Sequence, residues 1–130
     1  MKILIVDDSR FFRVTNQRAL NKAGHSVITA ADGEDGLQLA REHKPDLVVL
    51  DMLLPKLAGP DVLRAMRKDT RTASIPVMVL SSLAQSNERK LLDEGATSYF
   101  QKSGLTLDKG SEKFVEAVER MLLKPGASGA

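Results

Sequence analysis

The sequence predicts an α/β fold in which a five-stranded parallel sheet carries helices on both of its faces. Five short apolar runs alternate along the chain with segments of helical spacing, and the runs are apolar nearly throughout. Strands with this continuous apolar character are buried on both faces, and a strand-helix alternation is typical of parallel sheets. A chain of 130 residues fits one domain and can bury a real core.

Each expected strand is a run of mainly β-branched or aliphatic residues bounded by turn or helix signals. The first reads KILIV and ends at Asp7, and the third ends at Asp51 just before a turn marked by Pro55 and Gly59. The fourth is entered through Pro76. We expect strands at residues 2–6, 25–29, 46–51, 75–80 and 97–101.

The expected helices follow these strands and show apolar residues at helical spacing. Ser9 is a plausible N-cap for the first helix, and Gly24 is a plausible stop. A turn at Asp32-Gly33 precedes a helix over 34–43, and a fourth helix over 87–94 ends at Gly95. The expected inward residues are Phe11 or Phe12, Thr15, Ala19 and Ala23; Leu37 and Ala40; Val62, Leu63 and Met66; and Phe114, Val118, Met121 and Leu122.

Composition excludes several classes of function. The absence of cysteine rules out disulfides, thiolate metal sites and cysteine nucleophiles. No apolar stretch approaches the roughly 20 residues of a membrane span, and no export signal is visible, so we expect a soluble, cytoplasmic protein with no membrane contact. The net charge of +2, with no aromatic residues among basic runs, gives no direct nucleic-acid footprint.

Two segments leave alternatives open. The basic cluster at Arg64, Arg67, Lys68 and Arg71 can bind phosphate, but a solvated helix face explains it more simply. The sequence LKPGASGA closes the chain, and we assign residues 1–123 to one domain and 124–130 to a flexible tail or the start of a linker.

Polar residues follow four of the five strands. In an open parallel sheet the site lies beyond the carboxyl ends of the strands. Asp7 and Asp8 end the first strand and Asp51 the third. The fourth strand ends at Ser81 and Ser82, and the fifth at Lys102. All of these residues are therefore expected at one edge of the sheet.

This set of residues predicts phosphoryl-transfer chemistry. Three neighbouring carboxylates repel one another, and a hard divalent cation with oxygen ligands, Mg²⁺, relieves that repulsion. Lys102 adds a fixed positive charge and Ser81 a hydroxyl donor, while Asp51 can accept the phosphoryl group itself. Each element alone has a plainer reading: an acidic capping pair, a Ser-Ser turn, a surface lysine and a turn acid.

The motifs ILIVDDS at 3–9, VVLDMLLPKLAG at 48–59, VMVLSS at 77–82 and GATSYFQKS at 95–103 resemble the receiver domain of bacterial two-component response regulators. The resemblance covers nearly the whole chain. Within that family, the chain resembles the chemotaxis regulators. It implies a flavodoxin-like, doubly wound (βα)5 fold.

The resemblance also implies roles for individual residues. Asp51 is the phosphoacceptor, with Lys102 and Ser81 as its catalytic partners. Mg²⁺ is bound by Asp8, Asp51 and the backbone carbonyl of Leu53, and by Asp7 through water. The backbone groups of Met52 and Ser82 contact the phosphoryl group, and Ser81 and Tyr99 form the switch.

The implied partners are a sensor histidine kinase or a phosphotransfer protein, and a downstream protein target or a fused output domain missing from this chain. A small donor such as acetyl phosphate can also supply the group. The chain is then a phosphoacceptor that assists its own phosphorylation and dephosphorylation, not an enzyme acting on other molecules. Its output surface is the fourth helix, fifth strand and fifth helix, and it is a monomer or a phosphorylation-dependent dimer.

The chain departs from the family pattern at two positions and has apolar residues at two variable ones. Ser103 replaces the usual proline after Lys102, and Ser82 stands where the family commonly has Ala or Gly. Leu53 and Leu83 occupy variable positions beside the acceptor, where apolar side chains position the hydrolytic water poorly. We therefore expect a longer-lived phosphoryl group than in a receiver with polar residues at both positions.

Two other classes of protein share part of this pattern. A haloacid-dehalogenase-like phosphatase also uses an Asp nucleophile and Mg²⁺, but its nucleophile is on the first strand and a second acid follows two residues later. Asp51 is on the third expected strand and Leu53 follows. A pseudo-receiver, which keeps the fold as a phosphorylation-independent interaction module, is the stronger rival, although every charged member of the site is retained here.

Overall fold

The computed structural model describes residues 1–52, 54, 56–81, 95–101 and 109–122. Its strands are β1 (Lys2–Val6), β2 (Ser26–Ala30), β3 (Leu47–Asp51), β4 (Val77–Ser81) and β5 (Ser98–Gln101). Its helices are α1 (Arg10–Lys22), α2 (Gly33–His43), α3 (Gly59–Lys68) and α5 (Lys109–Leu122). The predicted helix over 87–94 lies outside the described residues.

The five strands form one parallel sheet in the order β2-β1-β3-β4-β5. The strand order reverses at β1, which pairs with β2 on one side and β3 on the other. Such a reversal leaves a crevice beyond the carboxyl ends of the two strands that flank it, here β1 and β3. The predicted doubly wound parallel fold is confirmed.

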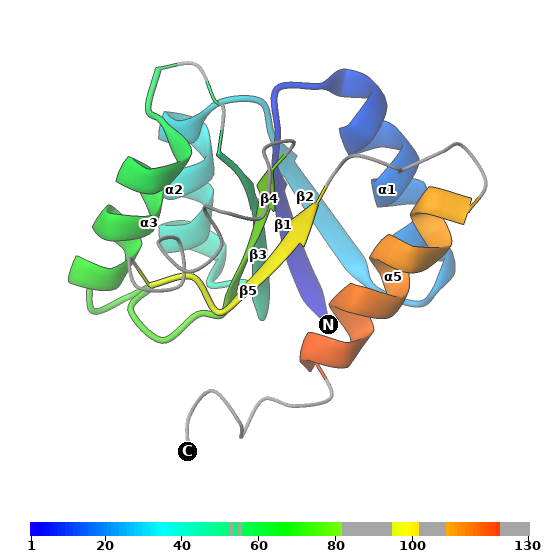
Figure 1. The fold of residues 1–130 in the computed structure, drawn as a ribbon. Coiled ribbons are helices and arrows are strands. Elements are labelled where there is room, and N and C mark those ends of the chain that lie inside the picture. Colours follow the sequence, from blue (N-terminus) through cyan, green and yellow to red (C-terminus); the bar gives the residue numbers. More distant parts are fainter. Residues whose placement is uncertain (53, 55, 82–94, 102–108, 123–130) are drawn as a thin grey trace.

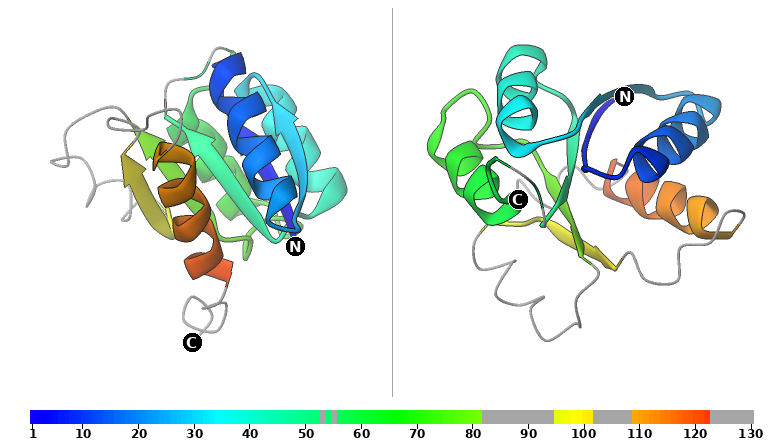
Figure 2. Two further views of the ribbon diagram at one scale, coloured as in Figure 1. Left: turned by 90° about the vertical axis from the view of Figure 1, so that its right-hand side faces the viewer. Right: turned by 90° about the horizontal axis from the view of Figure 1, so that it is seen from above.

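Helices cover both faces of the sheet, as Figures 1 and 2 show: α2 and α3 on one face, α1 and α5 on the other. Each face has its own apolar core. One core joins Leu37, Val62 and Met66 to alternate residues of the strands, and the other joins Phe12, Leu20, Phe114 and Val118 to the remaining strand residues. Consecutive strand residues point to opposite faces, so both cores require apolar residues, which explains the unbroken apolar runs.

The inward face of α1 differs from the prediction. Phe12, Asn16 and Leu20 are buried, whereas Phe11 is 63% exposed and Ala23 is exposed. The choice of Phe12 over Phe11 is fixed by its edge-on contact with Phe114 of α5, with ring centroids 5.5 Å apart. The predicted inward residues of α2, α3 and α5 are confirmed as core residues or as partly buried residues packed against the core.

The end of α1 explains why β2 begins one residue later than predicted. Gly24 has a φ of +100°, and the His25 N–H donates to the carbonyl of Leu20 at 3.0 Å. His25 therefore completes the helix end instead of starting the strand. The predicted N-cap is confirmed, because the Ser9 hydroxyl accepts a hydrogen bond from the Phe12 N–H at 3.2 Å.

Candidate functional site

Three carboxylates converge at the crevice between β1 and β3. Asp7 and Asp8 directly follow β1, and Asp51 is the last residue of β3. One oxygen from each carboxylate lies within 4.8 Å of the others. Asp7 is fully buried and Asp51 is 5% exposed, while Asp8 is exposed to solvent. The structure thus brings together the three acids that the sequence predicted at this edge.

Asp7 is oriented by the turn that starts α1. The Ser9 N–H donates to Asp7 Oδ1 at 2.8 Å, and the Arg13 guanidinium donates from Nη1 to the Asp7 carbonyl oxygen at 2.8 Å. Arg13 was not predicted as part of this region, because nothing in its spacing distinguishes it from a solvated helix residue. Its bond fixes the backbone between the two adjacent acids, and so it supports the geometry of the pair.

The backbone that follows Asp51 is fixed by two hydrogen bonds. The Met52 N–H donates to the Leu80 carbonyl at 3.1 Å, and the Met52 carbonyl accepts from the Gly59 N–H at 3.3 Å. In this structure the Met52 N–H completes the ladder between β3 and β4. Its predicted contact with the phosphoryl group stays a prediction.

The remaining predicted site residues are described in part or not at all. Ser81 is the last residue of β4 and Tyr99 lies in β5, opposite Val79 in the ladder, but the structure describes only their backbone. Ser82, Lys102 and Leu53 lie outside the described residues, as do Ser103 and Leu83. Their predicted roles stay predictions.

The acidic cluster suits a hard divalent cation. Its donors are carboxylate oxygens, which are the ligands that Mg²⁺ and Mn²⁺ accept, and two of the three are shielded from bulk water. Like charges this close are costly without a cation or another positive group. The residues present therefore fit a divalent metal.

The basic cluster of α3 and the turn that follows it is engaged within the chain. The Arg67 guanidinium donates to the carbonyls of Gly95, Ala73 and Ile75 at 3.0, 3.1 and 2.7 Å, and burial lowers its pKa. Arg64 pairs with Asp61 on the same helix. These bonds disfavour phosphate binding, and the predicted solvated face holds for the exposed Arg64 but not for the half-buried Arg67.

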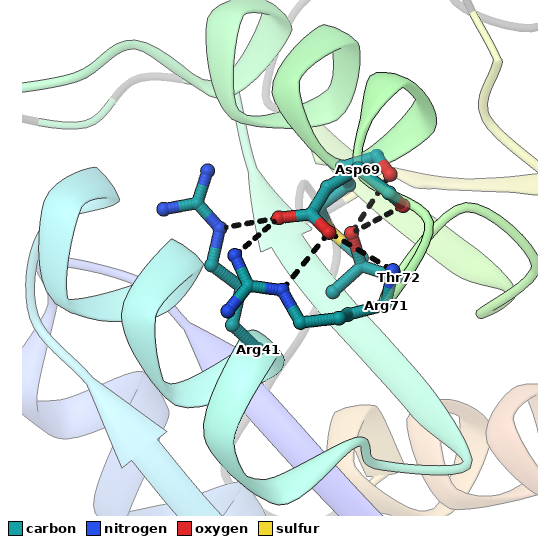
Figure 3. A network of polar contacts seen from close by, with 5 residues as sticks. Arg41, Asp69, Arg71 and Thr72 are labelled. Carbon is teal, nitrogen blue, oxygen red and sulfur yellow. Dashed lines mark hydrogen bonds and ion pairs between the residues drawn. The ribbon is translucent and has the colours of Figure 1, made fainter.

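Figure 3 shows how Arg71 is engaged: its guanidinium and that of Arg41 converge on the Asp69 carboxylate. The bonds from Arg71, with a smaller effect from Arg41, hold the pKa of Asp69 well below its ordinary value of 3.8. Thr72 donates its hydroxyl to the Met66 carbonyl at 2.8 Å. This network joins the carboxyl ends of α2 and α3 and has a structural role.

Known proteins share both the sequence pattern and the fold. The sequence model of the response regulator receiver domain matches residues 3–109. The chain belongs to the response regulator receiver family. PilH of Pseudomonas aeruginosa is 38% identical over 102 residues, which cover 78% of this chain and 84% of PilH.

Other curated relatives are longer than this chain. The gliding motility regulatory protein of Myxococcus xanthus is 36% identical over 122 residues, which are 93% of this chain and 15% of that protein. The transcriptional regulatory protein AfsQ1 of Streptomyces coelicolor is 38% identical over 109 residues, which are 82% of this chain and 47% of AfsQ1. The chain thus spans less than half the length of these two relatives.

Solved receiver structures have the same fold. The response regulator domain of Thermotoga maritima CheB has a TM-score of 0.82 at 26% identity, with 94% of this chain and 96% of that domain covered. The Mn²⁺-bound form of the response regulator Rcp1 has a TM-score of 0.79 at 26% identity, with 95% and 94% covered. Among the helices that the structure describes, none has the length and apolarity that a membrane crossing requires.

Proposed function

We propose that this chain is a phosphorylation-dependent switch of a bacterial two-component system and that Asp51 is its phosphoacceptor. The observation that carries the proposal is the convergence of Asp7, Asp8 and Asp51 at the crevice between β1 and β3. Membership of the receiver family supports a signalling role of this kind. The chain accepts a phosphoryl group and does not act as an enzyme on other molecules.

The proposed step is a displacement at phosphorus. A carboxylate oxygen of Asp51 forms the new P–O bond, while the P–N bond of a phosphohistidine breaks and its electron pair stays on the imidazole nitrogen. With acetyl phosphate, the P–O bond to the acetyl group breaks and acetate leaves. Burial of Asp51 restricts competing water, and its place at the end of a central strand fixes the oxygen that attacks.

A Mg²⁺ ion, when bound, supplies positive charge that balances the acids and the transferring phosphoryl oxygens. We assign its ligation to Asp8, Asp51 and the Leu53 carbonyl, with Asp7 acting through water. Arg13 and the Ser9 N–H hold Asp7 in place at the base of this site. Lys102 and the Ser81 hydroxyl complete the proposed machinery by binding phosphoryl oxygens.

The readout we propose is a change in the fourth helix, β5 and α5, driven by Ser81 and Tyr99. A dianionic group drawn toward Ser81 and Lys102 biases a two-state surface, and only interactions that differ between the states shift the population. The proposed donor is a sensor histidine kinase or phosphotransfer protein in the cytoplasm. The target is a separate protein or an output domain fused to a longer chain.

Intact-mass measurement after incubation with acetyl phosphate tests the proposal, with and without Mg²⁺ and with Asp51→Asn alongside. We expect a gain of one phosphoryl group in the wild type, only with Mg²⁺, and no gain in the variant. A folded wild type that gains nothing, from acetyl phosphate or from a histidine kinase, would instead favour a pseudo-receiver that presents a constitutive binding surface.

A further inference from the structure

The amino end of α2 lies against Lys56 and Leu57, in the connection from β3 to α3. Gly33, the first residue of α2, has no room for a side chain: a Cβ there would lie 2.7 Å from the carbonyl carbon of Leu57 and 2.8 Å from its Cβ. Real Cβ atoms do not approach that closely, so only glycine permits this contact. The contact joins α2, which contributes no residue to the cluster of Asp7, Asp8 and Asp51, to the segment that follows Asp51.

An ion pair crosses the same contact. Lys56 Nζ lies 3.7 Å from Asp32 Oδ2, and the Asp32 side chain is 11% exposed. Asp32 is the N-cap of α2, and its Oδ1 accepts the Asp35 N–H at 2.9 Å. That hydrogen bond, and secondarily the Lys56 charge, lower the pKa of Asp32, which therefore stays ionised at neutral pH. The Asp32 carboxylate is therefore held at the start of α2, and Lys56 pairs with it from the connection.

Lys56 also has an unusual backbone. Its φ is +66°, in the left-handed region that residues other than glycine, asparagine and aspartate rarely adopt. This conformation has to be stabilised by the surroundings. Two contacts of this segment are described: the close approach of Leu57 to Gly33 and the pairing of Lys56 with Asp32.

The far end of the connection is tied directly to the acceptor strand. A Cβ at Gly59 would lie 2.5 Å from the Asp51 carbonyl oxygen and 2.6 Å from Met52 Cα. The connection therefore begins and ends against the backbone of Asp51 and Met52. Lys56 and Leu57 are held against α2, so a change in these contacts can pass through Gly59 to the backbone beside the acceptor.

We propose that Asp32 and Lys56 form a latch that fixes the connection between β3 and α3 and thereby sets the metal affinity and phosphorylation rate of Asp51. This inference rests on the proposed function. Both are positioning residues: they act through the backbone of Lys56 and Leu57, which leads to Gly59 against Asp51, and not by contact with the phosphoryl group. Because Lys56 is 63% exposed, the pair contributes little to global stability, so its effect is local.

Four variants separate the latch from its surroundings. Lys56→Met removes the charge and keeps the aliphatic stem, and Lys56→Arg is the conservative rescue. Asp32→Ser keeps an N-cap oxygen for the Asp35 N–H and removes the charge. Lys44→Met is the matched control: Lys44 is an exposed lysine with a φ of +45°, and no ion pair joins it to an acid among the described residues.

Three readouts are needed: Mg²⁺ affinity by calorimetry, the rate of labelling by acetyl phosphate at subsaturating Mg²⁺, and hydrogen exchange in a peptide covering residues 52–59. We expect Lys56→Met and Asp32→Ser each to lower the Mg²⁺ affinity and the labelling rate by about two- to fivefold and to speed exchange. Lys56→Arg and Lys44→Met should behave as the wild type. High salt should remove the difference between wild type and Lys56→Met, because it screens an exposed pair.

Unchanged Mg²⁺ affinity in Lys56→Met and Asp32→Ser would overturn the latch, whether or not exchange in the peptide accelerates. An equal loss of Mg²⁺ affinity in Lys44→Met would overturn the latch as well, since that loss could not come from the pair of Asp32 and Lys56. A wild type that is never labelled overturns the proposed function instead, and calorimetry and exchange still decide the latch.

Discussion

Replacing Asp8 with asparagine should stabilise the metal-free protein and weaken its response to Mg²⁺. The carboxylate oxygens of Asp7, Asp8 and Asp51 lie within 4.8 Å of one another. At that separation two like charges repel by about 3.5 kcal/mol at an effective dielectric near 20, and by about 0.9 kcal/mol in bulk water. Because Asp8 is exposed, the repulsion in each of its two pairs, with Asp7 and with Asp51, is closer to the value for water. We expect a gain of about 1–2 kcal/mol in the free energy of unfolding.

Thermal unfolding in EDTA and in saturating Mg²⁺ measures both effects. For a chain of this size, about 1 kcal/mol corresponds to a rise in Tm of about 3–4 °C. Asp8→Asn should therefore melt higher than the wild type in EDTA and gain less from Mg²⁺, because a ligand stabilises in proportion to its binding. Glu42→Gln, which removes an exposed charge in the last turn of α2, is the control. A lower Tm of Asp8→Asn in EDTA, or an unchanged gain from Mg²⁺, would refute the reasoning.

Three further predictions concern other parts of the chain. Phe11 is 63% exposed in the first turn of α1, the helix that follows Asp8, so Phe11→Ala should slow phosphotransfer from a histidine kinase by about tenfold and leave labelling by acetyl phosphate unchanged. Equal effects on both donors would contradict a docking role. The pKa of Asp69 in the folded protein lies below its ordinary value of 3.8, so its charge stabilises the fold above pH 3.8 and this stabilisation is lost as the pH falls further. Asp69→Asn should therefore lower Tm at pH 7, and the difference in Tm from the wild type should close below about pH 4. Gly59→Ala should cost about 1–3 kcal/mol in urea unfolding, because its Cβ would meet the backbone of Asp51; a cost near zero would show that the backbone can move.

The acidic site was predictable because it depends on topology alone. In parallel strands that alternate with helices, the carboxyl ends share one edge, so acids that follow the first and third strands had to meet there. The predicted strands at 2–6 and 46–51 located those strand ends to within a residue. No side-chain contact had to be known for Asp7, Asp8 and Asp51 to be placed together.

Features that depend on contacts between distant segments were not predictable. The choice between Phe11 and Phe12 is settled by Phe114, which is about a hundred residues further along the chain. Helical spacing permits either residue. The partner of the Met52 N–H was not predictable for a similar reason, because it depends on the register of β4, where the Leu80 carbonyl accepts this N–H.

The left-handed backbone of Lys56 had no sequence signal at all, since lysine is not a residue type that favours it. Asp32-Gly33 was predicted as a turn, and the structure makes Asp32 the N-cap and Gly33 the first residue of α2. The pairing of Asp32 with Lys56 follows only once α2 packs against the connection from β3. Local patterns cannot reveal an ion pair of this kind.

The central claim is that Asp51 itself carries the phosphoryl group. Borohydride reduces an aspartyl phosphate to homoserine, and peptide mass spectrometry then locates the modified position. After reaction with acetyl phosphate and Mg²⁺, we predict homoserine at position 51 and at no other acid. Homoserine at position 7 or 8, or unmodified aspartate at 51 in protein that has gained a phosphoryl group, would contradict the account.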